Sequence, residues 1–540
     1  MLKTMNPLQE NRFLPGITKI LILSICNLVI CNLLIAQNIN STLGTLGVFT
    51  IKDASANYFT LSQSTGQVNI LKTLRLENTT NSTTGVIFKG IDRFIHNYGT
   101  DNTFIGMSSG NFTMTGNSNT ALGKYSLTSN TTGYWNTALG FQSLYNNAGG
   151  YQNTAVGLNS LYTNTTGYGN TSLGFQSLFG NTDGNQNTAV GLNSLYTNTI
   201  GYGNTAMGFQ SLFANNVGNQ NTAVGLNSLY TNTSGFSNTA MGYQSLFANS
   251  TGNYNTAVGY NSLFSNTTSS DNTAVGYKSL YSNTTGTFNT SLGYNSLFSN
   301  TIGNENTAVG LQSLYTNTTG YYNTALGLNS LYANTTGSFN TALGYNSLWN
   351  NTTGSNNTVI GYLAQVPYSI GDNQVRIGNS FITYAGINVA WAITSDRRWK
   401  SDIQDSKLSL SFINKLRPVS YFRNNDENKK TEYGFIAQDV EEVLKESGID
   451  NSGMITITDD GMYELRYNDL LAPMVKAIQE LNEKCSSLET ENNQLKTEIE
   501  SLKDMKDKIA KLEQTQLELI KIVKSKTGNE VQNINTSANK

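Results

Sequence analysis

Charged side chains are scarce in this chain. Its 540 residues include 33 lysines and arginines against 35 aspartates and glutamates, so that 13% are charged and the net charge is −2. A chain without a basic surplus offers no electrostatic footprint for nucleic acid. Proline is also rare, at five residues, which argues against a flexible proline-rich linker protein.

Cysteine and histidine are nearly absent. The three cysteines are Cys26, Cys31 and Cys485, and loss of the N-terminal segment described next would leave only Cys485. That count excludes a disulfide framework, so long-range order has to come from stacking. The single histidine, His96, has no neighbouring cysteines or clustered carboxylates and is predicted to pack rather than to bind zinc. We expect no metal and no other cofactor.

The first 37 residues are typical of a secretion signal. Basic residues, the last of them Lys19, precede an apolar run from Ile20 to Ala36. Polar side chains interrupt this run, and it is shorter than the ~20 residues that a membrane span needs. We expect cleavage near Ala36 or Gln37, which makes the mature chain secreted or cell-surface. An uncleaved signal anchor is the alternative, and it is the only membrane contact expected.

An internal repeat dominates the middle of the chain. The dipeptide Asn-Thr recurs every 17 residues from Asn102 to Asn357, giving sixteen copies without an insertion. The consensus, Asn-Thr-Ala-Val/Leu-Gly-x-x-Ser-Leu-Tyr/Phe-x-Asn-Thr-Thr-Gly-x-x, is too short and too rich in glycine for a helical hairpin. Such a period predicts a parallel β-roll or β-solenoid. Thr-Ala-Val is predicted to be a strand, and Ser-Leu-Tyr to be a second strand or a single helical turn.

The few charges in the array fit this prediction. Stacked coils place each residue about 4.8 Å above its counterpart, so a repeated charge would repel while repeated Asn and Thr hydrogen-bond along the stack. The repeated Tyr and Phe are expected in the core, with stacking on sugars as the alternative. The motif is similar to the head repeats of trimeric autotransporter adhesins, whose period is shorter. Between 102 and 361 the charged residues are Lys124, Asp183, Asp271, Lys278 and Glu305, which supply no carboxylate pair for glycoside hydrolysis.

The period fails after Gly361. Residues 373–378 and 380–384 are predicted to be two strands that close the stack. Further on, a helix is predicted at Asp439–Lys445 and a strand at Met454–Ile457. From Ile478 apolar residues recur in steps of three and four, which predicts a parallel coiled coil; a lone amphipathic helix packed on its own domain is the alternative.

Ser395 and Lys400 lie where the composition changes. A serine hydroxyl needs a base to take its proton, and a lysine can be that base only if burial or neighbouring cations lower its pKa from ~10.4. Arg397 and Arg398 are such cations if they lie close. Residues five apart face different sides of a helix, so the pair needs a turn at Ser395 or a lysine from another chain. Ordinary helix capping by Ser395 or Asp396, with a solvated Lys400, is the alternative.

Four ordered blocks around this pair carry a family resemblance. They are residues 395–403 (SDRRWKSDI), 416–421 (LRPVSY), 434–440 (GFIAQDV) and 463–470 (YELRYNDL), and an amphipathic helix follows. Residues 386–485 thereby resemble the C-terminal intramolecular chaperone of endosialidase tailspikes, a self-cleaving domain that also occurs in other phage fibres and bacterial surface proteins. Trp399 departs from the family, which usually has an aliphatic residue at this place.

The resemblance implies a homotrimer whose chaperone drives assembly of the fibre in front of it. It also implies that Ser395 attacks the carbonyl carbon of Thr394, with Lys400 as general base, and cuts the chain once between Thr394 and Ser395. Supporting roles fall to Asp396, Arg397 and Gln438, and no external substrate is expected. The competing expectations are a non-cleaving stalk, a binder of a cell-surface or glycan receptor, and a phage-type tail fibre, against which the secretion signal argues.

The expected fold is mainly β, followed by a small α+β domain and a coiled coil. The expected segments are a signal peptide (1–37), an N-terminal β-rich region (38–101), sixteen repeats (102–361), a β neck (362–394), the chaperone and auto-processing domain (395–472), the coiled coil (473–525) and a disordered tail (526–540).

Overall fold

The computed structural model describes residues 48–52, 57–62, 67–71 and 73–535, so the expected signal peptide lies outside the described residues. The chain divides into two units at Asn78. The first unit holds an antiparallel sheet of three strands, β1 (Val48–Lys52), β2 (Asn57–Ser62) and β3 (Val68–Ile70). The N-terminal region, which we predicted to be β-rich, therefore contains strands among its described residues.

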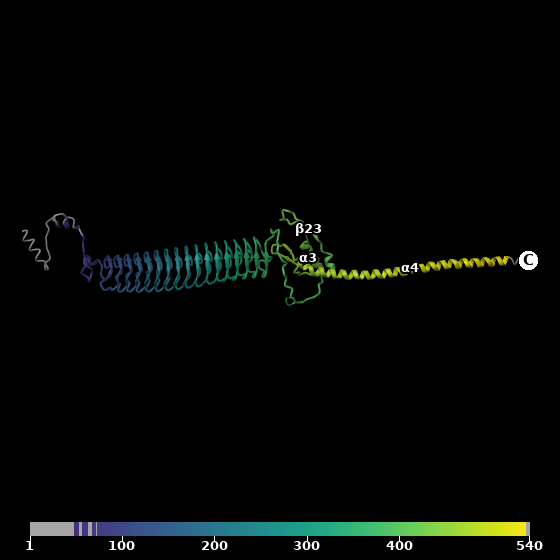
Figure 1. Ribbon diagram of the computed structural model, residues 1–540, viewed down its shortest axis with the longest axis horizontal. Helices are drawn as coiled ribbons and strands as arrows, with labels where there is room; N and C mark the ends of the chain where they lie inside the picture. The colour runs from purple at the N-terminus through teal and green to yellow at the C-terminus, as the bar shows by residue number, and fades with distance from the viewer. Residues whose placement is uncertain (1–47, 53–56, 63–66, 72, 536–540) are drawn as a thin grey trace, which may run out of the picture. The chain divides into compact units, whose positions relative to one another are not determined.

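The second unit begins with a parallel β-solenoid. A hairpin of β4 (Ile87–Lys89) and β5 (Asp92–His96) leads antiparallel into β6 (Thr103–Ile105), and each later strand pairs in parallel with the one 17 residues before it. Figure 1 shows the coils stacked along the purple, teal and green part of the chain. The predicted solenoid and its period are confirmed. The repeated strands are β7 (Thr120–Leu122), β8 (Thr137–Leu139), β9 (Thr154–Val156), β10 (Thr171–Leu173), β11 (Thr188–Val190), β12 (Thr205–Met207), β13 (Thr222–Val224), β14 (Thr239–Met241), β15 (Thr256–Val258), β16 (Thr273–Val275), β17 (Thr290–Leu292), β18 (Thr307–Val309), β19 (Thr324–Leu326), β20 (Thr341–Leu343) and β21 (Thr358–Ile360).

Alanine, leucine and asparagine fill the inside of the coils. The middle residue of the strand and the leucine of Ser-Leu-Tyr are fully buried, as in Ala223 and Leu229. Buried asparagines form continuous ladders: Asn232 Nδ2 donates to Asn215 Oδ1 at 2.8 Å and to the Gly235 carbonyl at 2.9 Å. These bonds satisfy polar groups that would otherwise be costly to bury. The predicted hydrogen bonding of asparagine along the stack is confirmed.

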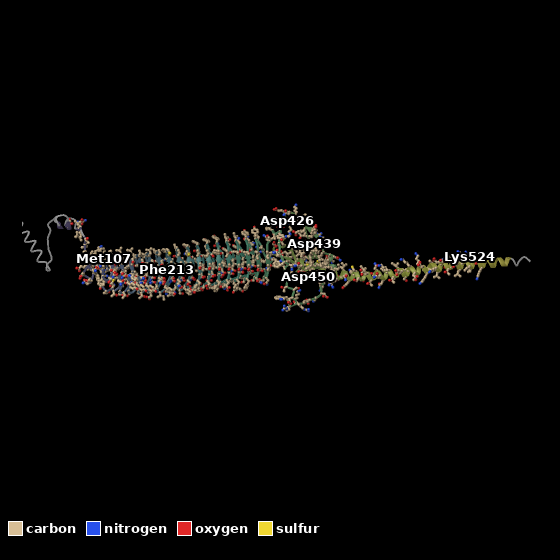
Figure 2. The ribbon with its side chains drawn as sticks, in the orientation of Figure 1. Met107, Phe213, Asp426, Asp439, Asp450 and Lys524 are labelled. Atoms are coloured by element: carbon tan, nitrogen blue, oxygen red, sulfur yellow. The ribbon has the colours of Figure 1, made fainter. Side chains whose placement is uncertain are left out.

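The repeated aromatic side chains lie outside the core, contrary to our expectation. Figure 2 labels Phe213, one ring of a ladder in which successive rings stack with centroids 5.1 to 5.3 Å apart. Each ring is half-buried. A coil whose inside is filled by Ala and Leu leaves no room for these rings, so they stack on one another at its edge. The ladder consists of Tyr145, Tyr162, Phe179, Tyr196, Phe213, Tyr230, Phe247, Phe264, Tyr281, Phe298, Tyr315 and Tyr332.

The Ser-Leu-Tyr segment is neither of the two structures predicted for it. Its leucine has a left-handed backbone, with φ of 52° at Leu229, whereas both a strand and a right-handed helical turn need negative φ. The segment is a turn that buries the leucine side chain. At the other turn, Ser269 replaces the usual glycine and is still buried, because its hydroxyl donates to Asn266 Oδ1.

An aromatic cluster covers the N-terminal end of the solenoid. Phe104 takes the place that alanine has in later coils, and its ring lies 4.7 Å from the ring of His96, centroid to centroid. His96 Nε2 donates to the Ser109 carbonyl at 2.8 Å, and its Nδ1 accepts from the backbone N–H of Tyr98. His96 is buried, so the predicted packing role is confirmed.

The stack continues one coil beyond the sequence repeat. β22 (Val375–Ile377) pairs in parallel with β21, again 17 residues apart. The second predicted closing strand, at 380–384, is wrong, because residues 380–394 contain no strand and are almost all exposed. Segment 362–394 therefore has a single strand, and an extended chain leads from it to Ser395.

A small α+β region follows. It contains η1 (Arg397–Trp399), α2 (Leu410–Ile413), the hairpin β23 (Val419–Tyr421) and β24 (Glu432–Gly434), α3 (Ala437–Glu446), the hairpin β25 (Ile455–Ile457) and β26 (Tyr463–Leu465), and η2 (Tyr467–Leu470). The helix predicted at 439–445 and the strand predicted at 454–457 are confirmed within one or two residues. Its core packs α2, α3 and η2 together through Leu408, Phe412, Val440, Leu444, Met454 and Leu470.

The chain ends in one long helix, α4 (Leu471–Asn535), labelled in Figure 1 together with α3 and β23. Its first turns pack on the region before it: Ala477 is buried, and Glu480 accepts from the backbone N–H of Leu410. Every residue from 481 to 526 is exposed, so the helix does not pack along its own domain. The helix also continues through Asn535, into the segment that we predicted to be a disordered tail.

Candidate functional site

A single turn of 3₁₀ helix brings Ser395 and Lys400 together. η1 (Arg397–Trp399) lies between them, and Lys400 follows it with an extended backbone. Lys400 Nζ donates to Ser395 Oγ at 2.6 Å within the same chain. On a regular 3₁₀ helix residues five apart are not aligned, so the pair meets because the backbone is extended on both sides of the turn, at Asp396 and at Lys400. The structure thus has the turn that the sequence spacing required.

Asp396 holds this turn in place. Its carboxylate accepts from the backbone N–H of Arg398 at 2.8 Å and forms an ion pair with the Arg398 guanidinium at 2.7 Å. These hydrogen bonds from Arg398, the side-chain bond first and the backbone bond second, lower the pKa of Asp396 from its usual value. Asp396 therefore caps η1, which is the ordinary role that we weighed for it, and Ser395 remains available to Lys400.

The other predicted site residues are spread more widely. Thr394, Ser395, Arg397 and Lys400 are all exposed, and no residue of η1 is buried. Gln438 lies in the first turn of α3 and is also exposed. Among the described residues no hydrogen bond links Gln438 to the Ser395–Lys400 pair, so its supporting role stays a prediction.

Three of the four family blocks meet in the α+β region. β23 comes from 416–421, and the last residue of β24 with the start of α3 comes from 434–440. The block 463–470 supplies Tyr467, whose hydroxyl accepts from the backbone N–H of Phe435 at 3.1 Å. The first block, which contains Ser395, adds no buried side chain to this core. The blocks beyond it therefore form the packed body, and the Ser395 turn lies on the exposed chain that enters it.

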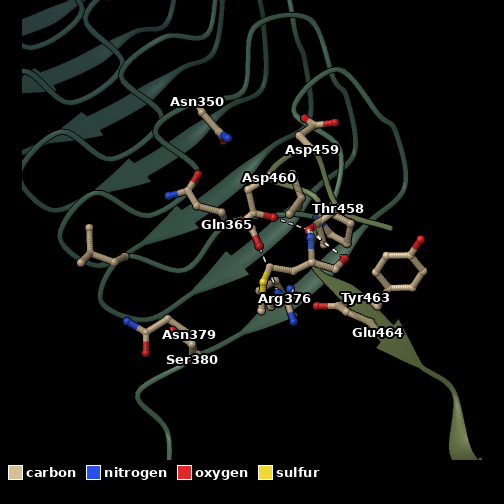
Figure 3. A pocket seen from close by; sticks show the side chains of 15 residues that line it. Asn350, Gln365, Arg376, Asn379, Ser380, Thr458, Asp459, Asp460, Tyr463 and Glu464 are labelled. Carbon is tan, nitrogen blue, oxygen red and sulfur yellow. Dashed lines mark hydrogen bonds and ion pairs between the residues drawn. The ribbon is translucent and has the colours of Figure 1, made fainter. Parts of the chain in front are cut away.

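Sequence reasoning missed a contact between the β25–β26 hairpin and the last solenoid coil (Figure 3). The Asp459 backbone N–H donates to the Pro367 carbonyl at 2.9 Å, and the Ser369 backbone N–H donates to Asp459 Oδ2 at 2.7 Å. Arg376 of β22 forms an ion pair with Glu464 of β26. The bond from Ser369 also lowers the pKa of Asp459. Partners that are about ninety positions apart leave no local pattern by which this contact could have been found.

Neither a metal cluster nor a membrane span is seen in the part of the chain that the structure describes. No group of three or more His, Cys, Asp and Glu side chains is placed to hold a metal ion there. None of the helices formed by the described residues is long and apolar enough to cross a membrane.

Comparison with known proteins gives a match to a family model. No curated protein and no solved structure matches the chain. The matched segment begins at Ser395 and includes the first three of the four blocks, while the block at 463–470 lies beyond it. Residues 395–449 match the family model Peptidase_S74, chaperone of endosialidase, and it is to this family that the C-terminal segment behind the solenoid is similar.

Proposed function

We propose that this protein is a secreted or cell-surface homotrimeric fibre whose C-terminal segment assembles the trimer and then cuts the chain between Thr394 and Ser395. A chaperone-of-endosialidase match behind a long β-solenoid fits a tail-fibre or adhesin-like protein. The observation that carries the cleavage is the 2.6 Å hydrogen bond between Lys400 Nζ and Ser395 Oγ, at the first residue of the match. Secretion rests on the sequence of residues 1–37.

In the proposed reaction Ser395 Oγ adds to the carbonyl carbon of Thr394 while a neutral Lys400 takes the hydroxyl proton. Collapse of the adduct breaks the bond between that carbon and the Ser395 nitrogen, and the nitrogen receives the proton from Lys400. Water then hydrolyses the resulting ester. The products are a carboxylate on Thr394 and a free amine on Ser395, and the Ser395 hydroxyl is restored.

Assembly supplies what the single chain lacks. An amine takes up a proton only when it is neutral, and desolvation favours the neutral form of a lysine. Ser395 and Lys400 are exposed in the single chain, so we infer that neighbouring copies cover them and that cleavage follows assembly. The preceding chain supports this: Ile387, Val389 and Trp391 alternate as in a strand, yet they are 55%, 80% and 73% exposed.

The test compares four full-length chains by intact mass and N-terminal sequencing: wild type, Ser395→Ala, Lys400→Ala and the matched control Ser401→Ala. Ser401 is an exposed serine beside Lys400, and it has no role in the proposed reaction. We expect wild type and Ser401→Ala to release the fragment 395–540 with Ser395 as its N-terminus, and the other two variants to remain whole.

Light scattering on the same samples separates the parts of the proposal. An uncut wild-type chain that is trimeric would support the assembly function and overturn the peptidase activity. An uncut and monomeric chain would overturn both. Cleavage at another bond, or cleavage that survives both substitutions, would remove Ser395 and Lys400 from the mechanism.

A further inference from the structure

An uncharged apolar stripe runs along one side of the solenoid. It consists of the fourth and sixth residues of each coil, which flank the glycine that ends each strand. The sixth residue is Phe, Leu or Tyr in every coil from Phe141 to Tyr362, and each of these side chains is 37 to 58% exposed. The fourth residue is Val, Leu, Met or Ile, as at Met207, which is 43% exposed. We call these two columns the apolar stripe.

The stripe is continuous because the strands pair in register. Met207 lies beside Val224, and Val224 lies beside Met241. With a rise of about 4.8 Å per coil and two outward residues per coil, the stripe measures roughly 60 by 10 Å, on the order of 600 Å². This is at the upper end of the ~300–600 Å² largest patch of an ordinary monomer and close to the ~800 Å² that each partner gives to a stable interface.

Polar residues mark the ends of the stripe. Its sixth position is Lys124 in the coil before Phe141 and Asn379 in the coil after Tyr362. The remaining charged residues of the array occupy other positions of the coil: Asp183 the fourteenth, Lys278 the seventh, and Asp271 and Glu305 the seventeenth. Of these, Lys278 lies next to the stripe, with its Nζ 5.4 Å from the centroid of the Tyr277 ring. The surface is therefore best complemented by a partner that is mainly apolar and that repeats at the spacing of the coils.

A sugar chain fits the stripe poorly. Carbohydrates stack on the free face of an aromatic ring. Along the stripe, Tyr243, Tyr260, Tyr277 and Tyr294 stack on one another with centroids 4.8 to 5.3 Å apart, so their faces are largely covered. What they present to solvent is mainly their edges.

A second copy of the chain meets each requirement, because it carries the same stripe at the same spacing. α4 points to the same partner: Leu488, Leu495 and Leu502 follow one another every seven residues and are 62%, 51% and 62% exposed. A parallel coiled coil formed by this seam would hold copies side by side and in the same direction. Equivalent solenoid coils would then lie next to each other.

We propose that the apolar stripe is the surface through which the solenoids of neighbouring copies pack against one another along their length. This rests on the proposed homotrimer, and it adds which face of the solenoid is buried in it. The charged side chains at the seventeenth position, Asp271 and Glu305, stay in solvent in this arrangement.

Photo-crosslinking in the full-length protein tests this directly. We would replace Phe209, in the stripe, by p-benzoylphenylalanine, which is also aromatic, and in a second protein Gln220, an exposed residue at the seventeenth position of the same coil. After irradiation we expect the Phe209 probe to give species of two and three chain masses, with adducts on stripe residues. The Gln220 probe should give a yield at least tenfold lower.

Light scattering before irradiation distinguishes the possible failures. A trimeric protein with equal crosslinks from both probes, or with none from Phe209, would overturn the stripe as the interface and leave the trimeric fibre intact. A Phe209 adduct with another molecule would also overturn it. A monomeric protein would overturn the stripe together with the proposed trimer. Far-UV circular dichroism confirms that both probe proteins retain the β-structure of the parent.

Discussion

At the scale of single residues, the buried asparagines decide whether the coils stay in register. Asn232 Nδ2 donates to Asn215 Oδ1, while its own Oδ1 accepts from Asn249 Nδ2 at 2.8 Å. Each amide thus acts as donor to the coil before it and as acceptor for the coil after it, which no other side chain of this size does with one planar group. A shift in register would leave these buried groups unpaired.

Replacement of Asn232 by Asp should therefore destabilise the solenoid strongly. The carboxylate cannot donate and would face Asn215 Oδ1 and the Gly235 carbonyl as a buried charge, at a cost of roughly 3–5 kcal/mol. Amide hydrogen exchange should accelerate in the neighbouring coils at pH 7, and less so in acid, where the carboxyl group is protonated. Asn216→Asp is the control, because Asn216 is exposed and its side chain accepts from Thr199. Equal effects of the two substitutions would contradict the role of the ladder.

His96 makes the stability of the N-terminal end of the solenoid depend on pH. Burial, as the largest cause, lowers the pKa of His96 to about 4, and nearby Arg93 lowers it further while the hydrogen bond to Ser109 opposes the shift. The folded state favours the neutral form of His96. Protonation would also place a hydrogen on Nδ1, where it would face the backbone N–H of Tyr98 and the hydrogen bond between them would be lost. The contribution of neutral His96 to the free energy of unfolding is therefore complete above about pH 6.5. As the pH falls towards 4, the free energy of unfolding decreases by roughly 2–3 kcal/mol.

This prediction is checked by the difference in unfolding free energy between wild type and His96→Gln across that range. The glutamine side chain would keep a donor and stay neutral, and the chain has no other histidine. As the pH falls, wild type should lose unfolding free energy relative to His96→Gln. A difference that does not change with pH would mean that His96 is no less basic in the fold than in the unfolded chain.

At the scale of elements, each coil turns at a glycine where the chains of neighbouring coils nearly touch. Gly225 has φ of +133°, and a Cβ built on it would lie 2.4 Å from the Gly242 carbonyl oxygen. Neither the backbone angle nor the space admits a side chain. This explains why glycine recurs at this position in every coil, whereas the other turn accepts Ser269.

Gly225→Ala should consequently open the stack in the middle. We expect a loss of at least ~2 kcal/mol in local stability, seen as faster hydrogen exchange in the coils on both sides. Gly149→Ala is the matched control, because its Cβ would meet only the Thr132 hydroxyl at 3.3 Å, and other coils carry threonine at that position. An unchanged exchange pattern in Gly225→Ala would contradict the close packing of the coils.

Sequence predicted the elements that repeat and missed those that depend on distant partners. The 17-residue repeat predicted the Thr-Ala-Val strand, its parallel pairing and the asparagine ladders, but it left open a second strand at Ser-Leu-Tyr that the structure does not have. The period did not reveal that Ala and Leu would exclude the aromatic rings from the core, because burial depends on the width of the coil. The strand predicted at 373–378 is confirmed as β22, but the period did not reveal that it pairs in register as one more coil, since Gln374 and Val375 replace the Asn-Thr of the repeat.

At the candidate site, too, local features could be predicted from the sequence and contacts between distant residues could not. The spacing of Ser395 and Lys400 required a turn, and η1 is that turn. The position of Gln438 was carried over from a resemblance, and in one chain it lies in α3 without a link to the pair. The contact of Asp459 with Ser369 could not be predicted, because local sequence contains no signal for it.

At the scale of the whole molecule, the exposed seam of α4 is the part on which assembly should depend. Leu488→Lys with Leu495→Lys would place like charges in the predicted coiled-coil core, and trimers should be lost. Cleavage should fall at least tenfold with them, because it is proposed to follow assembly. Light scattering and the yield of fragment 395–540 are the measurements.

Thr490→Lys with Thr497→Lys is the control for this experiment. Both threonines are exposed and lie off the seam, so assembly and cleavage should remain. Monomers of the leucine variant that still cut at Thr394–Ser395 would contradict the dependence of cleavage on assembly. Trimers of the leucine variant would show that the seam is not needed for assembly.

The hairpin contact at the last coil has a consequence for what cleavage would do. Pro367, Ser369 and Arg376 precede the bond between Thr394 and Ser395, whereas Asp459 and Glu464 follow it. While the chain is whole, its own tether keeps these groups at a high effective concentration. Once the chain is cut, the same few polar contacts join two separate molecules and weaken as salt and dilution increase. Departure of the hairpin would then leave the Pro367 carbonyl, the Ser369 N–H and the Arg376 guanidinium without these partners at the end of the solenoid.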